Sequence, residues 1–120
     1  MPSRGPLILV VDDDEDIRVS LGQLLSAAGY SVETANDGQD ALDRLVRGSK
    51  PALLLLDLRM PRKSGEDVLS ALRKSVTLVD LPVIVLSAYL EAPPPGAVAW
   101  LKKPVKPSLL LSTIEHYLKL

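Results

Sequence analysis

Residues 52–61 read ALLLLDLRMP, an unbroken aliphatic run that ends in a single carboxylate, Asp57, before a loop with a proline. A strand that is buried on both faces of a parallel sheet has such continuous aliphatics. Open parallel sheets bind their ligands just beyond the carboxyl ends of their strands. We therefore expect a buried strand over 52–57 and a functional carboxylate at its end.

A second aliphatic run also ends in acids. Residues 7–11 read LILVV, and five consecutive acidic residues, 12–16, follow them. Carboxylates this close repel one another unless cations, a helix end or water offset their charge. If the two runs are parallel strands of one sheet, both groups of carboxylates meet at the same edge. A cluster of this kind suits Mg²⁺, which favours one or two carboxylates, a carbonyl and several waters.

Length and composition predict one domain. The chain has 120 residues and a formal net charge of -1, so one core is expected and the basic footprint that nucleic-acid binding demands is missing. Without cysteine, disulfides and zinc sites with sulfur ligands are excluded. The first residues resemble neither a signal peptide nor a membrane span. We expect a cytoplasmic domain over 7–120 behind a tail over 1–6, without direct nucleic-acid or membrane binding.

Two hydrophobic periodicities alternate along the chain, which is typical of an α/β domain. The predicted strands cover 7–11, 30–35, 52–57, 83–86 and 98–102. The predicted helices begin near Ile17, at Asp37, at Ser64 and at Pro107. Residues 89–96, YLEAPPPG, break the alternation, because three consecutive prolines exclude a normal helix. A loop is therefore expected between the last two strands.

Four motifs stand in order at the predicted strand ends. They are the acidic pair 12–13, the run 57–61 with Gly65 behind it, Ser87-Ala88, and Lys103-Pro104. With them, nearly the whole chain resembles the receiver domain of two-component response regulators. The resemblance implies a flavodoxin-like α/β fold, a doubly wound parallel sheet of five strands in the order 2-1-3-4-5. It also implies a signalling domain, rather than an enzyme, that takes a phosphoryl group onto Asp57 and then switches its protein interactions.

The resemblance assigns the phosphate chemistry to particular residues. Asp57 would be the phosphoacceptor, and a sensor histidine kinase or a phosphotransfer protein would be the donor. Asp12, Asp13 and Asp57 would bind Mg²⁺ together with the backbone carbonyl of Arg59. Lys103 would pair with the phosphoryl oxygens as a compact point charge.

Further roles follow from the same resemblance. Ser87 would donate its hydroxyl to the phosphoryl group, and Trp100 would be the switch aromatic that turns inward when Ser87 moves. Arg59 and Tyr89, both bulky, would slow the approach of water to the acyl phosphate. The peptide bond between Lys103 and Pro104 would be cis.

One departure from the family pattern concerns the stretch from Ser87 to Lys103. These residues are sixteen positions apart, fewer than is usual in the family, and the missing stretch is the fourth helix. Its loss is expected to uncover aliphatic residues on one face of the last two strands, which monomers rarely tolerate. We expect a second copy of the chain, another protein or a refolded proline-rich loop to cover this face.

The chain also allows two other interpretations. A calcium loop beginning at Asp12 fails, because Ile17 stands where glycine is needed and Gln23 where a bidentate glutamate is needed. A degenerate receiver, which keeps the fold but acts as a phosphate-independent interaction module, is the alternative function. The loss of the fourth helix favours this alternative, whereas retention of Asp13, Asp57, Ser87 and Lys103 argues against it.

Overall fold

The computed structural model describes residues 5–60, 64–88 and 92–118. Within these ranges five parallel strands form one sheet in the order β2-β1-β3-β4-β5. The strands are β1 (Leu7–Val11), β2 (Ser31–Ala35), β3 (Leu53–Asp57), β4 (Val83–Ser87) and β5 (Ala99–Lys102). The helices are α1 (Glu15–Ala27), α2 (Gly38–Val46), α3 (Gly65–Arg73) and α4 (Pro107–Leu118). The flavodoxin-like fold and its strand order are as predicted.

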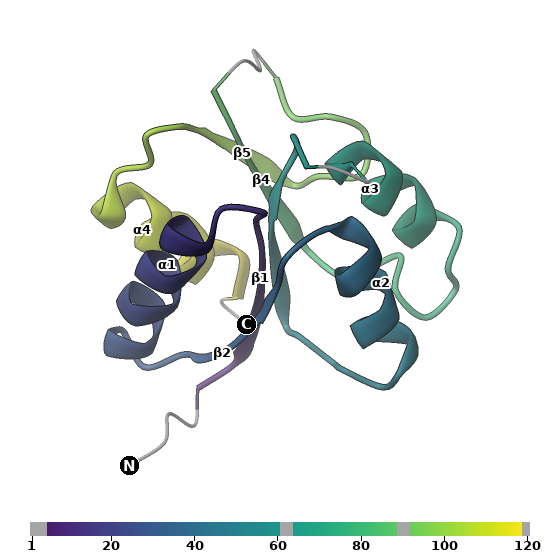
Figure 1. Cartoon of the computed structure of the whole chain (residues 1–120), viewed down its shortest axis with the longest axis horizontal. Coiled ribbons are helices and arrows are strands. Elements are labelled where there is room, and N and C mark those ends of the chain that lie inside the picture. Colours follow the sequence, from purple (N-terminus) through teal and green to yellow (C-terminus); the bar gives the residue numbers. More distant parts are fainter. Residues whose placement is uncertain (1–4, 61–63, 89–91, 119–120) are drawn as a thin grey trace.

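Two helical layers cover the sheet. Helices α1 and α4 lie on one face, and α2 and α3 lie on the other (Figure 1). Successive strand side chains point to opposite faces, so each strand contributes to two cores. One core joins Leu9, Leu54, Leu56, Val83 and Val85 to α2 and α3, and the other joins Ile8, Val10, Leu53, Leu55 and Ile84 to α1 and α4. Strands β3 and β4 are buried along their whole length, as continuous aliphatics predict.

Side-chain caps fix where three helices begin. Asp14 accepts a hydrogen bond from the amide of Ile17 at the start of α1, and Asp37 caps α2 in the same way. Ser64 and Asp67 form a capping box at the start of α3, as their spacing predicted. Each cap satisfies amide groups that the first helical turn leaves without an intrahelical partner.

The connection from β4 to β5 differs from the other three connections between strands, each of which contains a helix. Its described residues, 88 and 92–98, contain no helix, in agreement with the predicted loop. The amide of Ala97 donates to the carbonyl of Pro94 at 3.1 Å, and Gly96 has a φ of 96°. Pro95 and Gly96 therefore occupy the centre of a turn with the features of type II. The amide of Val98 then donates to the carbonyl of Val83 at 2.9 Å, which brings the chain back beside β4.

This turn packs against α3, toward which the connection crosses in Figure 1. A Cβ atom on Gly96 would lie 2.9 Å from Cδ of Arg73 and 3.6 Å from Cδ2 of Leu69. On the same face of the sheet, Val83 and Val85 are 1% and 0% exposed. The expectation of uncovered aliphatics is therefore wrong for β4, because both valines are buried within the single chain. Of the three expected covers, the refolded proline-rich loop agrees with the structure, since Ala97 of the connection packs against the core that contains these valines.

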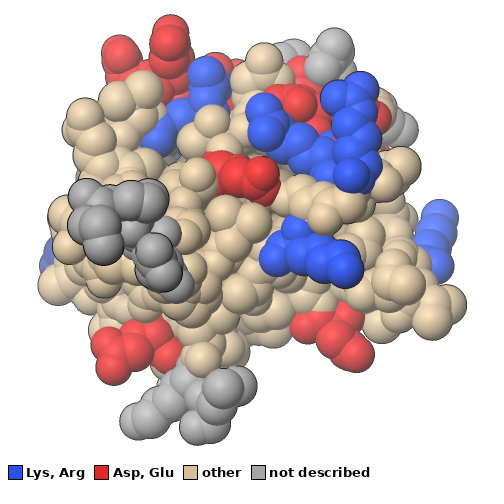
Figure 2. Space-filling model, turned by 90° about the horizontal axis from the view of Figure 1, so that it is seen from below, with Lys and Arg blue, Asp and Glu red and all other residues tan. Residues whose placement is uncertain are grey.

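The molecular surface carries charges of both signs. Seen from below the orientation of Figure 1, Lys and Arg side chains lie mainly on the right half, with Asp and Glu interspersed (Figure 2). This mixture accords with the net charge of -1.

In the described part of the chain, no helix has the length and apolar character that crossing a bilayer requires.

Two glycine substitutions test the turn between β4 and β5, which stands where receiver domains are expected to have a helix. Gly96→Ala should lower the free energy of unfolding by about 1–2 kcal/mol, because the left-handed backbone is unfavourable for a residue with a Cβ atom. Gly22→Ala in α1 is the matched control, since its Cβ atom would meet only Val32 at 3.8 Å. It should raise stability by about 0.5–1 kcal/mol. Urea unfolding measures both values, and an equal effect of the two substitutions would contradict a constrained turn at Gly96.

Candidate functional site: an acidic pocket at one edge of the sheet

Four strands bring polar side chains to one edge of the sheet. Asp12 directly follows β1, Asp57 and Ser87 are the last residues of β3 and β4, and Lys103 directly follows β5. The strand register aligns these ends, because Asp57 lies opposite Leu86 in β4. Since the carboxyl ends of parallel strands share an edge, residues up to 91 positions apart in sequence meet there.

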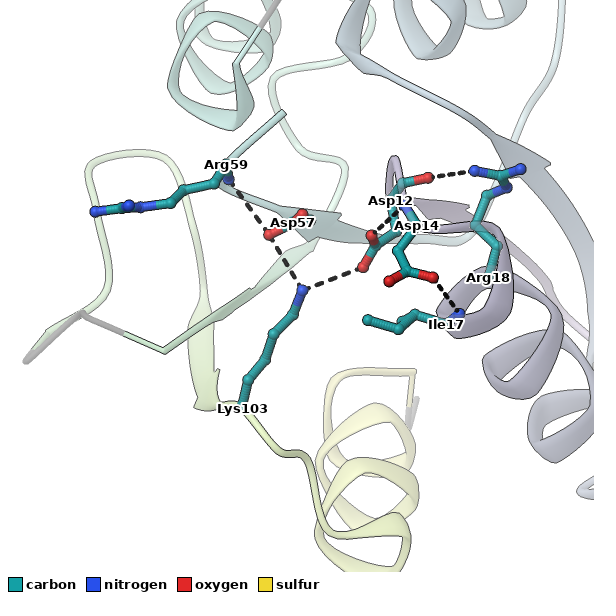
Figure 3. A network of polar contacts seen from close by, with 7 residues as sticks. All are labelled: Asp12, Asp14, Ile17, Arg18, Asp57, Arg59 and Lys103. Carbon is teal, nitrogen blue, oxygen red and sulfur yellow. Dashed lines mark hydrogen bonds and ion pairs between the residues drawn. The ribbon is translucent and has the colours of Figure 1, made fainter. Parts of the chain in front are cut away.

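Lys103 joins the two buried carboxylates. Its Nζ atom lies 3.2 Å from Oδ2 of Asp12 and 3.3 Å from Oδ1 of Asp57, and its side chain reaches between them (Figure 3). Asp12 is 1% exposed and Asp57 is 6% exposed. Burying carboxylates without a counter-charge is costly. Lys103 therefore compensates part of the cost of placing both acids at this edge.

Asp13 completes the acidic cluster. It is exposed, and one carboxylate oxygen from each of Asp12, Asp13 and Asp57 lies within 4.8 Å of the others. The sequence predicted that these three acids meet. Oxygen donors alone suit a hard cation such as Mg²⁺, which keeps several waters when it binds to carboxylates. The exposed side of Asp13 leaves access for those waters, so the residues present fit the ion.

The environment changes the proton affinity of two of these groups. Burial, together with the charge of Asp12, raises the pKa of Asp57 above its ordinary value, although Lys103 and the amide of Arg59 oppose the change. Burial lowers the pKa of Lys103, but the charges of Asp12 and Asp57 outweigh it, so the net pKa is raised. The Asp57 carboxyl group thus lies in a site that disfavours its charged form, an arrangement that is common for the titratable groups of functional sites.

The connection from β3 to α3 packs tightly beside Asp57. A Cβ atom on Gly65 would lie 2.7 Å from the carbonyl oxygen of Asp57 and 2.7 Å from Cα of Leu58. The amide of Gly65 donates to the carbonyl of Leu58 at 3.0 Å. Only glycine allows so close an approach of two backbone segments. Gly65 therefore lets α3 begin directly against the end of the strand that carries Asp57.

The remaining predicted residues lie around this pocket. Ser87 is 5% exposed, and its carbonyl accepts from the amide of Lys103 at 3.1 Å. Trp100 is half-buried opposite Val85 and packs against the core on the side of α2 and α3. The bond between Lys103 and Pro104 is cis, as expected from the resemblance. Tyr89 lies outside the described residues.

Arg59 and Arg18 contact the pocket through the backbone. The amide of Arg59 donates to Oδ1 of Asp57 at 3.3 Å, whereas its side chain extends away from Asp57 in Figure 3. Arg18 donates from Nη1 to the carbonyl of Asp12 at 2.7 Å. Sequence reasoning missed Arg18; its place one helical turn after the cap Asp14 was the available signal.

Comparison with known proteins identifies the family. Residues 8–115 match the response regulator receiver domain. The chain belongs to this family. A receiver domain is a signalling module of two-component systems rather than a classical enzyme, and the acidic pocket with Lys103 is consistent with phosphoacceptor function. The triad Asp12, Asp13 and Asp57 is typical of the magnesium site of receivers.

Individual relatives support this assignment. The receiver is 42% identical to the response regulator MprA of Mycolicibacterium vanbaalenii over 128 aligned positions, which include 99% of this chain and 52% of the relative. It is also 43% identical to MprA of Mycobacterium leprae over 93% of this chain and 50% of that protein. The chain thus spans about half the length of the curated relatives it matches. The first alignment is longer than this chain, so that relative contains segments which this receiver lacks.

Solved structures agree with the fold. The chemotaxis protein CheY4 of Vibrio cholerae superposes with a TM-score of 0.84 at 30% identity, over 94% of this chain and 98% of that chain. The signal receiver domain of a signal transduction histidine kinase from Syntrophus aciditrophicus gives a TM-score of 0.85 at 26% identity, over 95% of this chain and 90% of that chain. Receivers from different protein contexts therefore share this architecture.

The raised pKa of Asp57 predicts a stability that depends on pH. Because the folded state holds this proton more tightly than the unfolded state, the contribution of Asp57 to stability declines as the pH rises from 3.8 through the raised value. At pH 7 without divalent cations, Asp57→Asn should therefore be more stable than wild type. Its advantage should shrink as the pH falls toward 3.8.

Urea unfolding at pH 7 and at pH 4, with a chelator present, measures this difference. The exposed Asp80→Asn is the matched control and should stay within about 0.5 kcal/mol of wild type at both values. An Asp57→Asn variant less stable than wild type at pH 7 would show that the ion pair with Lys103 outweighs burial, and would contradict a raised pKa at Asp57.

Proposed function

We propose that Asp57 of this receiver accepts a phosphoryl group from a phosphohistidine on a sensor histidine kinase or a phosphotransfer protein, and that the modification switches its protein interactions. The observation that carries the proposal is the arrangement of Asp57, buried and 3.3 Å from Lys103, in a cluster with Asp12 and Asp13. The family of the chain supports a histidine kinase as the class of donor.

The proposed step is a displacement at phosphorus. A carboxylate oxygen of Asp57 attacks, the bond from phosphorus to the histidine nitrogen breaks, and the imidazole leaves with the bonding electrons. The protein must mainly position the phosphoryl group and neutralise the charge on its oxygens. Lys103 supplies a positive charge at the pocket, and Ser87 donates its hydroxyl to a phosphoryl oxygen.

A cation would complete this charge balance. Asp12, Asp13, Asp57 and the backbone carbonyl of Arg59 would hold Mg²⁺, which supplies charge neutralisation on the phosphoryl oxygens when it is bound. Asp12 and Asp57 are buried, whereas Asp13 is exposed, so the donor would approach the pocket beside Asp13.

The switch would run from Ser87 to the half-buried Trp100, whose ring turns inward as Ser87 moves toward the phosphoryl group. Trp100 is the only tryptophan of the chain, so its fluorescence reports this motion. A homodimer is not needed to cover β4, since Val83 and Val85 are already buried within one chain.

Intact mass measurement tests the phosphoacceptor. Incubation with Mg²⁺ and acetyl phosphate should add one phosphoryl group to wild type and none to Asp57→Ala, because the nucleophile is missing in the variant. A chelator should abolish the gain in wild type. No gain in wild type, under conditions that modify an ordinary receiver, would favour the phosphate-independent interaction module, which the loss of the fourth helix supports.

The lifetime of the phosphorylated form tests Arg59 and Tyr89. The Arg59 side chain extends away from Asp57 in the unphosphorylated protein (Figure 3), so the prediction requires it to turn toward the phosphorylated site. Replacing both bulky side chains in an Arg59→Asn, Tyr89→Glu variant should then shorten the lifetime about tenfold, equivalent to about 1.4 kcal/mol of barrier, because water reaches the acyl phosphate more easily. Decay of the phosphorylated mass at fixed pH measures this rate. Exposed Arg47→Asn is the control for loss of charge, and an unchanged lifetime in the double variant would refute the assignment.

A further inference from the structure

Arg18 reaches back from α1 to the end of β1. Its Nη1 atom donates to the carbonyl oxygen of Asp12 at 2.7 Å, a short bond of the charge-assisted kind. In Figure 3 the guanidinium lies on the side of Asp12 that faces away from Lys103. Arg18 is also tied to the first turn of its helix, since its amide donates to the carbonyl of Asp14 at 3.0 Å.

Asp12 is held by its neighbours at four points. Its amide donates to the carbonyl of Ala35 in β2 at 3.2 Å, and Arg18 holds its carbonyl. Its Oδ1 atom accepts from the amide of Asp14 at 2.9 Å, and its Oδ2 atom accepts from Lys103 at 3.2 Å. Of these contacts, the one from Arg18 acts on the peptide group that joins Asp12 to Asp13. A rotation of this peptide group would change the direction in which the chain presents the exposed Asp13.

We propose that Arg18 is a positioning residue of the cation site: by holding the carbonyl of Asp12, it orients the carboxylates of Asp12 and Asp13 toward a shared cation. This inference rests on the proposed function, since it concerns the same pocket. Arg18 acts through the backbone and not by contact with the reacting atoms. Groups that orient metal ligands in this way typically change metal affinity by about 10–100-fold.

The direction in which Mg²⁺ affinity changes when Arg18 is replaced distinguishes a positioning role from a purely electrostatic role. Removing a cationic side chain beside an acidic pocket makes the local potential more negative, which by itself strengthens the binding of a divalent cation. If Arg18 mattered only through its charge, a neutral substitute would bind Mg²⁺ more tightly. If Arg18 orients the acids, the neutral substitute binds Mg²⁺ more weakly in spite of the gain in potential.

Calorimetric titration with Mg²⁺ at pH 7 tests the proposal on wild type, Arg18→Met, Arg18→Lys and Arg47→Met. The Kd of Arg18→Met should rise about tenfold, and that of Arg18→Lys should lie between Arg18→Met and wild type, because an ammonium retains a donor. Arg47→Met removes a charge from the exposed end of α2 and should leave the Kd unchanged. Amide hydrogen exchange gives a second readout, with faster exchange at Asp14 in Arg18→Met without Mg²⁺.

The Kd values for Mg²⁺ decide whether Arg18 has the positioning role. An Arg18→Met Kd equal to or lower than that of wild type overturns the positioning role. If this variant does not fold, Arg18→Gln takes its place, and an Arg18→Gln Kd no higher than wild type likewise overturns the role. Absence of Mg²⁺ binding by wild type defeats the proposed function together with this inference, whereas weaker binding by the variant alone supports both.

Discussion

Three carboxylates lie within 4.8 Å of one another at the edge of the sheet, and two of them, Asp12 and Asp57, are buried. Their repulsion and their loss of hydration oppose folding, so neighbouring connections supply compensating groups. Lys103 provides the charge after β5, and the amides of Asp14 and Arg59 provide hydrogen bonds after β1 and β3. These three connections thus supply the groups that offset part of the cost of bringing the acids together.

These groups offset only part of the cost of burying the charge of Asp57. The stability of the fold is therefore coupled to the chemistry of this carboxylate. The pKa of Asp57 stays raised because burial and the charge of Asp12 exceed the effect of Lys103. A site in this condition favours any ligand that brings positive charge, or any modification that moves charge away from the carboxylate. Stability lost in the free protein is therefore available as binding free energy for a cation, which fits the family to which the chain belongs.

The short connection between β4 and β5 shows how the fold tolerates the loss of one helix. A turn centred on Pro95 and Gly96 places the chain against Arg73 and Leu69 of α3, and Val83 and Val85 remain buried. Ala97 of this connection packs against the core on this side. The turn at Gly96 thus contacts α3 shortly before the chain enters β5.

Much of this protein follows from its sequence alone. Continuous aliphatics determined the buried strands β3 and β4, and Asp37, Ser64 and Asp67 determined two helix starts, because these signals act over a few neighbouring residues. The two acid-ending runs also predicted that Asp12, Asp13 and Asp57 meet, since parallel strands place their carboxyl ends at one edge. The resemblance to receiver domains added Lys103 to this site.

Other features depended on the tertiary structure. No local sequence pattern predicts that Arg18 contacts the carbonyl of Asp12 or that Gly96 packs on Arg73. The same is true of the burial of Val83. The sequence predicted a loop after Ser87 but left open what would cover β4. Only the folded chain decided this, because coverage depends on where a turn is placed in space relative to α3, and long-range packing sets that position.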